Sequence, residues 1–476
     1  MRMSSFQSGV RFLALPNPQQ AATLRRWIGC QRHIFNAKVE EDRLFVAQRR
    51  MMLREDADAV IRTPLDRLYA QFKDDHLTPW LSDVPSQVLR EGTYRWFNTK
   101  QRQLKGLAKA PRKRSQRDFN SVMLCSDLFE FTEDGRLILG TAKFPVGRLH
   151  FNAHRPFGHP KMITLRESAG RWFVSFSYEQ SVDTVENAGK DSQLLREPHE
   201  LAYELGLLGE KEVAALTLGI DRNVADNCVA TSRGDFFLPE AVMLERIARK
   251  ARGAKRQQKR LARTKKGSAN RRKAAARVAR KYGYKAEVLR DFAHKTSLAL
   301  SDSGAKLIVF EDLKIQNMTR RPKAKQDNSG RWLRNGRAAK AGLNRSILSS
   351  AWGRIRVMTQ YKAARRNVLV GFVRPHHSSQ ECSLCGHTHP ENRHGAAFLC
   401  QRCGYAQHAD LNAATNIAAR GVTLLRSGEL ETPPKAKKRV AVKRRTNSGS
   451  VRPGVSVEHL QDAASGLAPG TPRTML

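Results

Sequence analysis

Four cysteines in the C-terminal part of the chain have the spacing of a metal site. They form C-x2-C, fourteen intervening residues and a second C-x2-C, and they are Cys382, Cys385, Cys400 and Cys403. This pattern is typical of a zinc ribbon, in which two short knuckles present four thiolates to a tetrahedral Zn²⁺ ion. A glycine follows each pair, where a tight knuckle favours a residue that tolerates positive φ. Because four thiolates complete the coordination shell, we expect the zinc to hold a small unit together rather than to catalyse a reaction.

Three carboxylates form a second candidate site, because each stands at the end of a predicted element. Asp221 ends the apolar run VAALTLGID, Glu311 ends the run KLIVFE, and Asp410 begins the helical pattern HADLNAATNIA. Any one of them alone is most often a turn or helix-capping residue. Together they offer the oxygen ligands that Mg²⁺ prefers, with Mn²⁺ as an alternative. Converging carboxylates can hold two such ions about 3.5 to 4 Å apart for phosphodiester cleavage, so the triplet predicts a metal-dependent nuclease.

The elements that carry these acids follow one another in the order of an RNase-H-like domain. A strand up to Asp221 is followed by two short strands around residues 233–235 and then by a helical segment over 249–295. A buried-type strand over 306–310 delivers Glu311, and GLNRSILSSAWGRIRVMTQYKAARR has helical spacing before the strand VLVGFV. The helix that starts near Asp410 completes the order. We therefore predict an α+β multidomain chain with a nuclease scaffold in its C-terminal half.

The N-terminal half divides into a helical and a strand-rich part. Residues 1–110 are predicted to be mostly helix after the strand-like VRFLAL. Strands dominate from about 118 to 180, where MITLRES and WFVSFSY predict a hairpin that turns at Ala169 and Gly170. The acidic and polar stretch 181–215 is interpreted as a connector with little chemistry.

The charge of the chain indicates a polyanionic partner. It contains 85 Lys and Arg against 44 Asp and Glu, which gives a formal net charge of +41 over 476 residues. Nineteen of the basic residues lie in 249–295, where they form either a solvated helical face or a phosphate-contacting surface. No run approaches the roughly 18 to 20 apolar residues of a membrane span, and no signal peptide is recognised. We expect a cytoplasmic protein that associates with nucleic acid and not with a membrane.

The remaining three cysteines, Cys30, Cys125 and Cys228, stand apart from one another and from the ribbon. Seven cysteines in all are too few and too uneven for a secreted disulfide framework. We interpret these three as small, buried hydrophobic residues.

The motifs together resemble one known family. GIDRNV, VFEDL, the four-cysteine ribbon and HADLNAATNIA occur in the order seen in the RuvC nuclease domains of TnpB proteins and compact type V CRISPR effectors. The segments PNPQQAATLRRWIGCQRHIFNA and WLSDVPSQVLREGTYRWF are similar to the opening helices of the same family. The resemblance covers roughly residues 9–421, and it is weakest between 100 and 160.

This resemblance implies a RuvC (RNase-H-like) nuclease domain with an inserted zinc ribbon, an N-terminal helical recognition lobe and a wedge-type β-barrel. It implies that Asp221, Glu311 and Asp410 bind the catalytic metal ions. The partners would be a structured guide RNA and a target DNA that carries a short flanking motif. The implied boundaries are 1–20 and 111–212 for the barrel, 21–110 for the helical lobe, 213–421 for the nuclease domain, 376–407 for the ribbon and 422–476 for a disordered basic tail.

Four functions remain open on the sequence alone. The main hypothesis is an RNA-guided DNA endonuclease. The alternatives are an RNA-guided DNA binder that silences transcription with little cleavage, a transposase that transfers DNA strands, and a basic zinc-ribbon protein that coats RNA. Arg222 and Asn223 after the first aspartate, and the spelling HADLNAA, differ from many TnpB proteins and leave the transposon and CRISPR contexts both open.

Overall fold

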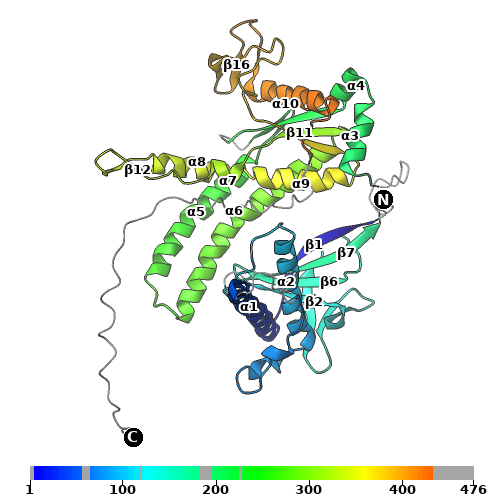
Figure 1. Ribbon diagram of the computed structural model, residues 1–476, viewed down its shortest axis with the longest axis vertical. Helices are drawn as coiled ribbons and strands as arrows, with labels where there is room; N and C mark the ends of the chain where they lie inside the picture. Colours follow the sequence, from blue (N-terminus) through cyan, green and yellow to red (C-terminus); the bar gives the residue numbers. More distant parts are fainter. Residues whose placement is uncertain (1–4, 56–64, 117–118, 182–194, 225–227, 433–476) are drawn as a thin grey trace.

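The computed structural model describes residues 5–55, 65–116, 119–181, 195–224 and 228–432. Figure 1 shows two lobes: one is built from the N-terminal part of the chain, from β1 to β7, and the other from the part between α3 and α10. Within the described ranges, every helix is either too short or too polar to span a lipid bilayer.

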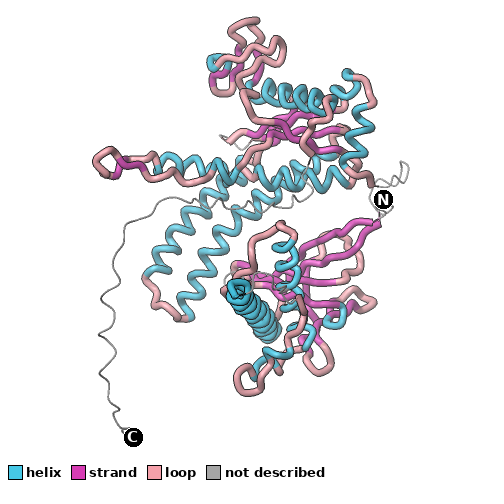
Figure 2. The backbone as a smooth tube through the Cα atoms, in the orientation of Figure 1, coloured by secondary structure: helices cyan, strands magenta, loops and turns pink. Residues whose placement is uncertain are grey.

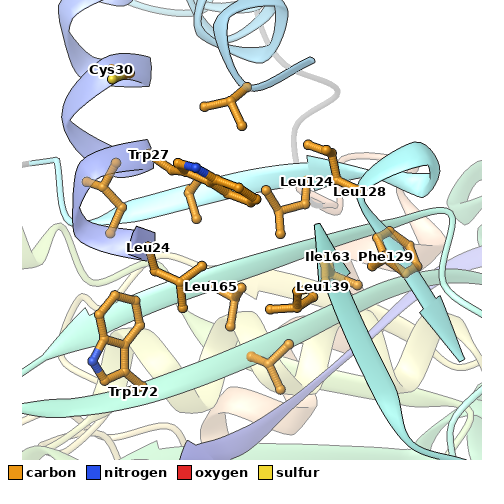
Figure 3. Packing of buried hydrophobic residues seen from close by; sticks show 14 of the residues in the cluster. Leu24, Trp27, Cys30, Leu124, Leu128, Phe129, Leu139, Ile163, Leu165 and Trp172 are labelled. Carbon is orange, nitrogen blue, oxygen red and sulfur yellow. The ribbon is translucent and has the colours of Figure 1, made fainter. Parts of the chain in front are cut away.

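The first lobe is an antiparallel sheet of seven strands covered by two helices. The strand order is β2-β6-β7-β1-β5-β4-β3. Its core joins Leu24 and Trp27 of one helix to strand residues such as Leu124 and Leu165 (Figure 3). The elements are β1 (Ser5–Leu15), α1 (Pro18–Glu55), α2 (Ser86–Leu104), β2 (Ser121–Cys125), β3 (Phe129–Phe131), β4 (Leu137–Gly140), β5 (Pro145–Asn152), β6 (Met162–Ser168) and β7 (Arg171–Ser181), with short 3₁₀ turns at Ala70–Phe72, Pro79–Leu81 and Ser126–Leu128.

Local sequence accounts for two of the predicted boundaries in this lobe. The backbone N–H of Gln20 donates to Asn17 Oδ1 at 2.8 Å and that of Asn17 to Gln20 Oε1 at 3.0 Å, a reciprocal cap that starts α1 at Pro18. Ala169 and Gly170 both have positive φ, 53° and 73°, which suits the tight turn between β6 and β7. The predicted hairpin is thus confirmed.

The second lobe contains a five-stranded sheet in the order β10-β9-β8-β11-β14. Strands β8, β11 and β14 are parallel, whereas β9 pairs antiparallel with β8 and β10 pairs antiparallel with β9. All residues of β11 and β14 are buried, as expected for parallel strands covered on both faces. The strands are β8 (Thr217–Arg222), β9 (Val229–Thr231), β10 (Phe236–Phe237), β11 (Leu307–Glu311) and β14 (Leu369–Val373).

Helices cover both faces of this sheet. One face packs on α6 (Ala269–Ser301) and α9 (Trp352–Ala364), and the other on α3 (Pro198–Gly206), α4 (Glu210–Ala215) and α10 (Ala409–Arg426). The predicted basic segment forms an antiparallel pair of helices, α5 (Ala241–Ala262) and α6, and lies beside the first lobe in Figure 1. Arg171 of β7 contacts Glu287 of α6 at 3.2 Å across the two lobes.

Close approach of α10 to the sheet depends on a glycine. A Cβ atom added to Gly219 of β8 would lie 2.0 Å from the carbonyl oxygen of Ala414, and no such approach is tolerated. Gly421 on α10 has the same property, because its added Cβ would lie 2.4 Å from Val309 of β11. The helix therefore sits directly on the two strands that carry Asp221 and Glu311.

Three expectations from the sequence are wrong in part. Residues 198–215 are not a passive connector, because Leu201, Leu205 and Val213 complete the apolar core under α10. The continuous helix expected around residue 350 is broken, since Ala351 adopts φ 58° between α8 (Arg337–Ser349) and α9. The expected disordered tail does not begin at 422, because α10 continues to Arg426 and residue 431 pairs with β14; residues 433–476 lie outside the described residues.

Of the three isolated cysteines, Cys30 and Cys228 are buried, as predicted, and Cys125 is partly exposed.

Candidate active site

The three predicted carboxylates lie at one edge of the five-stranded sheet. Asp221 and Glu311 occupy the carboxyl ends of β8 and β11, which are parallel neighbours with Ile220 opposite Phe310. Asp410 lies in the first turn of α10, which packs on β8. Residues that are 90 and 99 positions apart in the sequence thus meet because parallel strands end at the same edge and the last helix returns to that edge.

The mutual proximity of the acids is evident in the electrostatics of Asp221. Its pKa is raised to about 7, first by burial and then by the negative charges of Glu311 and Asp410. A hydrogen bond from the backbone of Arg222 and the charge of Arg393 act in the opposite direction. A carboxyl group held in this way is destabilised as an anion and gains from a nearby cation.

Asp410 is almost fully buried, with 2% of its surface exposed, and both of its oxygens have partners. Asn223 donates its amide N–H to Oδ2 at 3.0 Å, and Arg393 donates a guanidinium N–H to Oδ1 at 2.8 Å. Arg393 belongs to the cysteine ribbon, in β15 (Arg393–His394). The ribbon therefore supplies a positive charge to the carboxylate site.

Glu311 is held from two directions. Its Oε1 accepts a hydrogen bond from the hydroxyl of Ser378 at 2.6 Å, and its side chain is 7% exposed. Its backbone carbonyl accepts from Arg222 at 2.7 Å. Arg222 is buried beside the rings of Phe310 and Trp352, and burial lowers its pKa to about 10. This arginine places a fixed positive charge behind the acids.

The donor set fits hard divalent cations, because it consists of carboxylate oxygens at the edge of the sheet. The oxygens of the three acids do not all lie within 4.8 Å of one another; among the described residues, only the four cysteines form a group that compact. The guanidinium of Arg393 also donates a hydrogen bond to Oδ1 of Asp410. The acids therefore have to draw closer, and the guanidinium has to turn away, for one ion to contact all three.

The four predicted zinc ligands do come together. The Sγ atoms of Cys382 and Cys403 are 3.7 Å apart, and those of Cys385 and Cys400 are 3.6 Å apart. Four sulfurs around Zn²⁺ at about 2.3 Å would be separated by about 3.8 Å, so the cluster fits a tetrahedral ion. Gly386 follows the first pair and Gly404 the second, and both have φ 71°.

A row of polar side chains on α10 connects the ribbon to the carboxylate site. Asn412 donates to the carbonyl of Glu381 at 2.7 Å and accepts from the N–H of Ser383 at 2.9 Å. One turn further along, Asn416 donates to the carbonyls of Ser378 and Glu381 at 3.0 and 2.7 Å. The chain that enters the first knuckle is thus fixed to the helix that carries Asp410.

Sequence reasoning missed Arg393 and Ser378 as members of the site. Arg393 lies between the two cysteine pairs, and nothing in the ligand spacing distinguishes it from the other basic residues of the ribbon. Ser378 follows the two histidines before the first knuckle, and its residue type gives no sign that it contacts Glu311. Both contacts depend on how the ribbon folds back over the sheet.

Three family models match separate parts of the chain. They are described as a Cas12f1-like TNB domain over residues 352–417, a probable transposase over 196–321 and a helix-turn-helix domain over 3–43. In the structure, residues 5–43 form β1 and the first part of the uninterrupted helix α1, so they contain no helix-turn-helix.

Some curated relatives match most of the chain, and others match a short part of it at higher identity. A putative RNA-guided DNA endonuclease InsQ of Escherichia coli (strain K12) is 29% identical over 88% of this chain and 94% of its own length. A TnpB-like protein of Aquifex aeolicus (strain VF5) is 32% identical over 27% of this chain and 39% of its own length. The CRISPR-associated endodeoxyribonuclease Cas12f1 of Sulfoacidibacillus thermotolerans is 48% identical over 12% of this chain and 14% of its own length.

The chain is thus similar to proteins of the TnpB and compact type V effector family, over most of its length to the relative from Escherichia coli and over shorter segments to the others. The family resemblance that the motifs predicted is confirmed. The matches include both a probable transposase model and Cas12f1-like proteins, so these comparisons leave the transposon and CRISPR contexts both open.

Proposed function

We propose that this protein is an RNA-guided DNA endonuclease that cleaves target DNA at Asp221, Glu311 and Asp410. The observation that carries the proposal is the convergence of these three acids at one sheet edge, where burial and mutual repulsion raise the pKa of Asp221 to about 7. Such a site stores unfavourable negative charge that divalent cations relieve. The name of the relative from Escherichia coli supports RNA guidance and DNA as the substrate.

The three acids would hold Mg²⁺, or Mn²⁺, which would activate water and stabilise the leaving oxygen of the phosphodiester. Asn223 orients Asp410 and Ser378 orients Glu311 through the hydrogen bonds described above. Arg393 pairs with Asp410 in the absence of substrate. A guanidinium at this place is suited to contact a scissile phosphate once it has turned away from the carboxylate.

The proposal assigns the second lobe to a RuvC-like, RNase-H-like nuclease domain that carries a zinc ribbon. It assigns the seven-stranded sheet to a wedge-type barrel and α1 and α2 to the recognition lobe. The parallel order of β8, β11 and β14, with helices on both faces, supports the first assignment. The position of Leu201 and Leu205 in the nuclease core favours a boundary near residue 195 rather than at 212.

Guide RNA and target DNA fit the charge of the chain. With 85 Lys and Arg, it offers many phosphate contacts that carry no sequence information. Base pairing between guide and target would supply the sequence choice, whereas the protein would hold the heteroduplex and read a short flanking motif.

The test is cleavage by Asp221→Ala in the presence of the RNA that co-purifies with the protein. Sequencing of that RNA identifies the variable end, and a plasmid that carries the complementary target serves as substrate. We expect the variant to lose cleavage by at least about 10³-fold while it retains RNA-dependent DNA binding. The exposed Asp75→Ala is the matched control and should cut at the wild-type rate. Wild-type protein that binds the target but never cuts it would instead indicate a silencing protein.

A second candidate function is DNA strand transfer, because the family model described as a probable transposase covers Asp221 and Glu311. The same acids could direct a DNA 3′-hydroxyl, rather than water, at a phosphodiester. Incubation with DNA that carries the ends of the flanking element distinguishes the two reactions. Joined products would favour transfer, and cleaved ends alone would favour hydrolysis.

A further inference from the structure

A basic hairpin projects from the nuclease-containing lobe and takes no part in the site described above. This arm comprises residues 320–340, with the short strands β12 (Lys325–Gln326) and β13 (Trp332–Leu333) near its tip. Figures 1 and 2 show its tip at the outermost left end of the lobe, beyond α8, whose first residues form the end of the arm. Among the described residues, none of the arm belongs to a buried core cluster, so the arm contributes little to the core of the protein.

The charge of the arm is almost entirely positive. Eight of its 21 residues are Lys or Arg, and its single acidic residue is Asp327. Within the part of the chain that the structure describes, none of these eight basic side chains makes an ion pair. So many uncompensated positive charges on a narrow hairpin indicate an anionic ligand.

Asp327 forms no ion pair with these basic side chains among the described residues, because its carboxylate accepts hydrogen bonds within the turn of the hairpin. Asp327 Oδ1 accepts hydrogen bonds from the Ser329 hydroxyl at 2.7 Å, the Arg331 N–H at 2.8 Å and the Ser329 N–H at 3.0 Å. These bonds, that of the Ser329 hydroxyl first, lower the pKa of Asp327, so the carboxylate is ionised and able to accept them at neutral pH. The hairpin is thereby organised before any ligand binds, which reduces the entropy lost on binding.

Trp332 stands on this hairpin without a partner. It is 67% exposed, and among the described residues no ring or cation stacks on it. Leu333, its neighbour on the opposite face of the strand, is 49% exposed. An exposed indole among arginines is the combination that binds unpaired bases, because the ring stacks on a base and the cations contact the adjoining phosphates.

We propose that the arm binds single-stranded DNA through stacking of a base on Trp332, and that it guides the strand toward the carboxylate site. The identity of the strand rests on the proposed function. In a duplex the base faces are already stacked and cannot contact the indole. An acidic protein segment would pair with the cations but would leave the exposed indole without a role. The arm begins nine residues after Glu311, with only α7 (Ile315–Met318) between them, so its base lies near the sheet edge that carries the acids.

The binding test compares Trp332→Ala with Trp332→Tyr and Leu333→Ala in the full-length protein. The probe is a fluorescein-labelled oligothymidylate of about 20 nucleotides, measured by anisotropy at roughly 0.3 M salt, where contacts to phosphates alone are weak. We expect Trp332→Ala to reduce affinity about fivefold or more, and the other two variants to stay within about twofold of the wild type. A duplex of the same length should bind Trp332→Ala and the wild type alike. Equal affinity of Trp332→Ala and wild type for the single strand, or an equal loss on the duplex, would overturn the proposal.

Photochemical cross-linking locates the contact directly. DNA that carries 5-iodouracil should cross-link to the peptide that contains Trp332, and unlabelled single-stranded DNA should compete for this product more strongly than an equal amount of duplex or of RNA. Trp80, which is 45% exposed in the first lobe, is the internal control and should remain unmodified. Cross-links at other peptides only, or stronger competition by RNA, would refute the assignment to DNA. Neither experiment uses a guide RNA or measures cleavage. Their results can therefore be interpreted even if the proposed nuclease function is wrong.

Discussion

Replacement of Asp221 by asparagine should stabilise the metal-free protein, and the gain should depend on pH. The pKa of Asp221 in the folded state is about 7, whereas aspartate in an unfolded chain titrates near about 3.9. Between these values the folded state binds more protons than the unfolded state. The stabilising contribution is complete below about pH 4 and is lost as the pH rises through 7.

The magnitude follows from the two pKa values. Between pH 5 and pH 8 the wild type should lose about 3 kcal/mol of unfolding free energy through this one group, at about 1.36 kcal/mol per pKa unit. This is an upper value, because Asp221 keeps part of its surface in contact with water. Asparagine has nearly the same shape and does not ionise, so Asp221→Asn should lack this loss.

The assay is urea unfolding followed by tryptophan fluorescence in magnesium-free buffer at pH 5 and pH 8. Trp352 reports on the lobe that contains the site, since it lies beside Arg222. We expect Asp221→Asn to be more stable than the wild type at pH 8 and similar to it at pH 5, and addition of Mg²⁺ at pH 8 should narrow the difference. The exposed Asp75→Asn should behave as the wild type at both pH values. A gain of the same size at both pH values would show that the electrostatic explanation is incorrect.

Two further predictions concern the packing of α10 and the ribbon. Gly219→Ala should destabilise the protein by about 3 kcal/mol or more, because the new methyl group would force α10 away from β8; Gly283→Ala in α6, where nothing lies within 4 Å, should be neutral or stabilising in the same urea experiment. Cys400→Ser should reduce the zinc content measured by atomic absorption below one ion per chain, whereas Cys125→Ser should leave it unchanged; retention of a full equivalent by Cys400→Ser would contradict the four-thiolate site.

The sequence predicted the structure correctly for those elements that depend on local interactions. The helix that follows VRFLAL, the turn at Ala169 and Gly170 and the buried run that ends in Glu311 all form as predicted. The order of the elements also predicted that Asp221 and Glu311 lie at the ends of two strands, and the parallel pairing of these strands in the structure accounts for their proximity. The resemblance to the family was evident from the same motifs.

Tertiary contacts account for what the sequence did not predict. Nothing in a helical pattern indicates that the chain turns at Ala351, because the break depends on the packing of α9 against the sheet. The pairing of Arg393 with Asp410 depends on how the whole ribbon is oriented, and one of many arginines is selected by that orientation alone. The role of residues 198–215 was missed because short apolar positions within an acidic stretch gave no clear period.

The three acids of the site are synthesised at different times, because they lie far apart in the sequence. Asp221 and Glu311 emerge from the ribosome first, but the site has no third acid until Asp410 follows. Until α10 is complete, this face of the sheet has only α3 and α4 as helical partners in the core. A nascent or truncated chain that stops before this helix can carry the arm and the basic helices, but it cannot assemble the carboxylate triplet. The proposed cutting site can thus form only after α10 has been synthesised, when the arm and the basic helices that precede it in the chain have already been made.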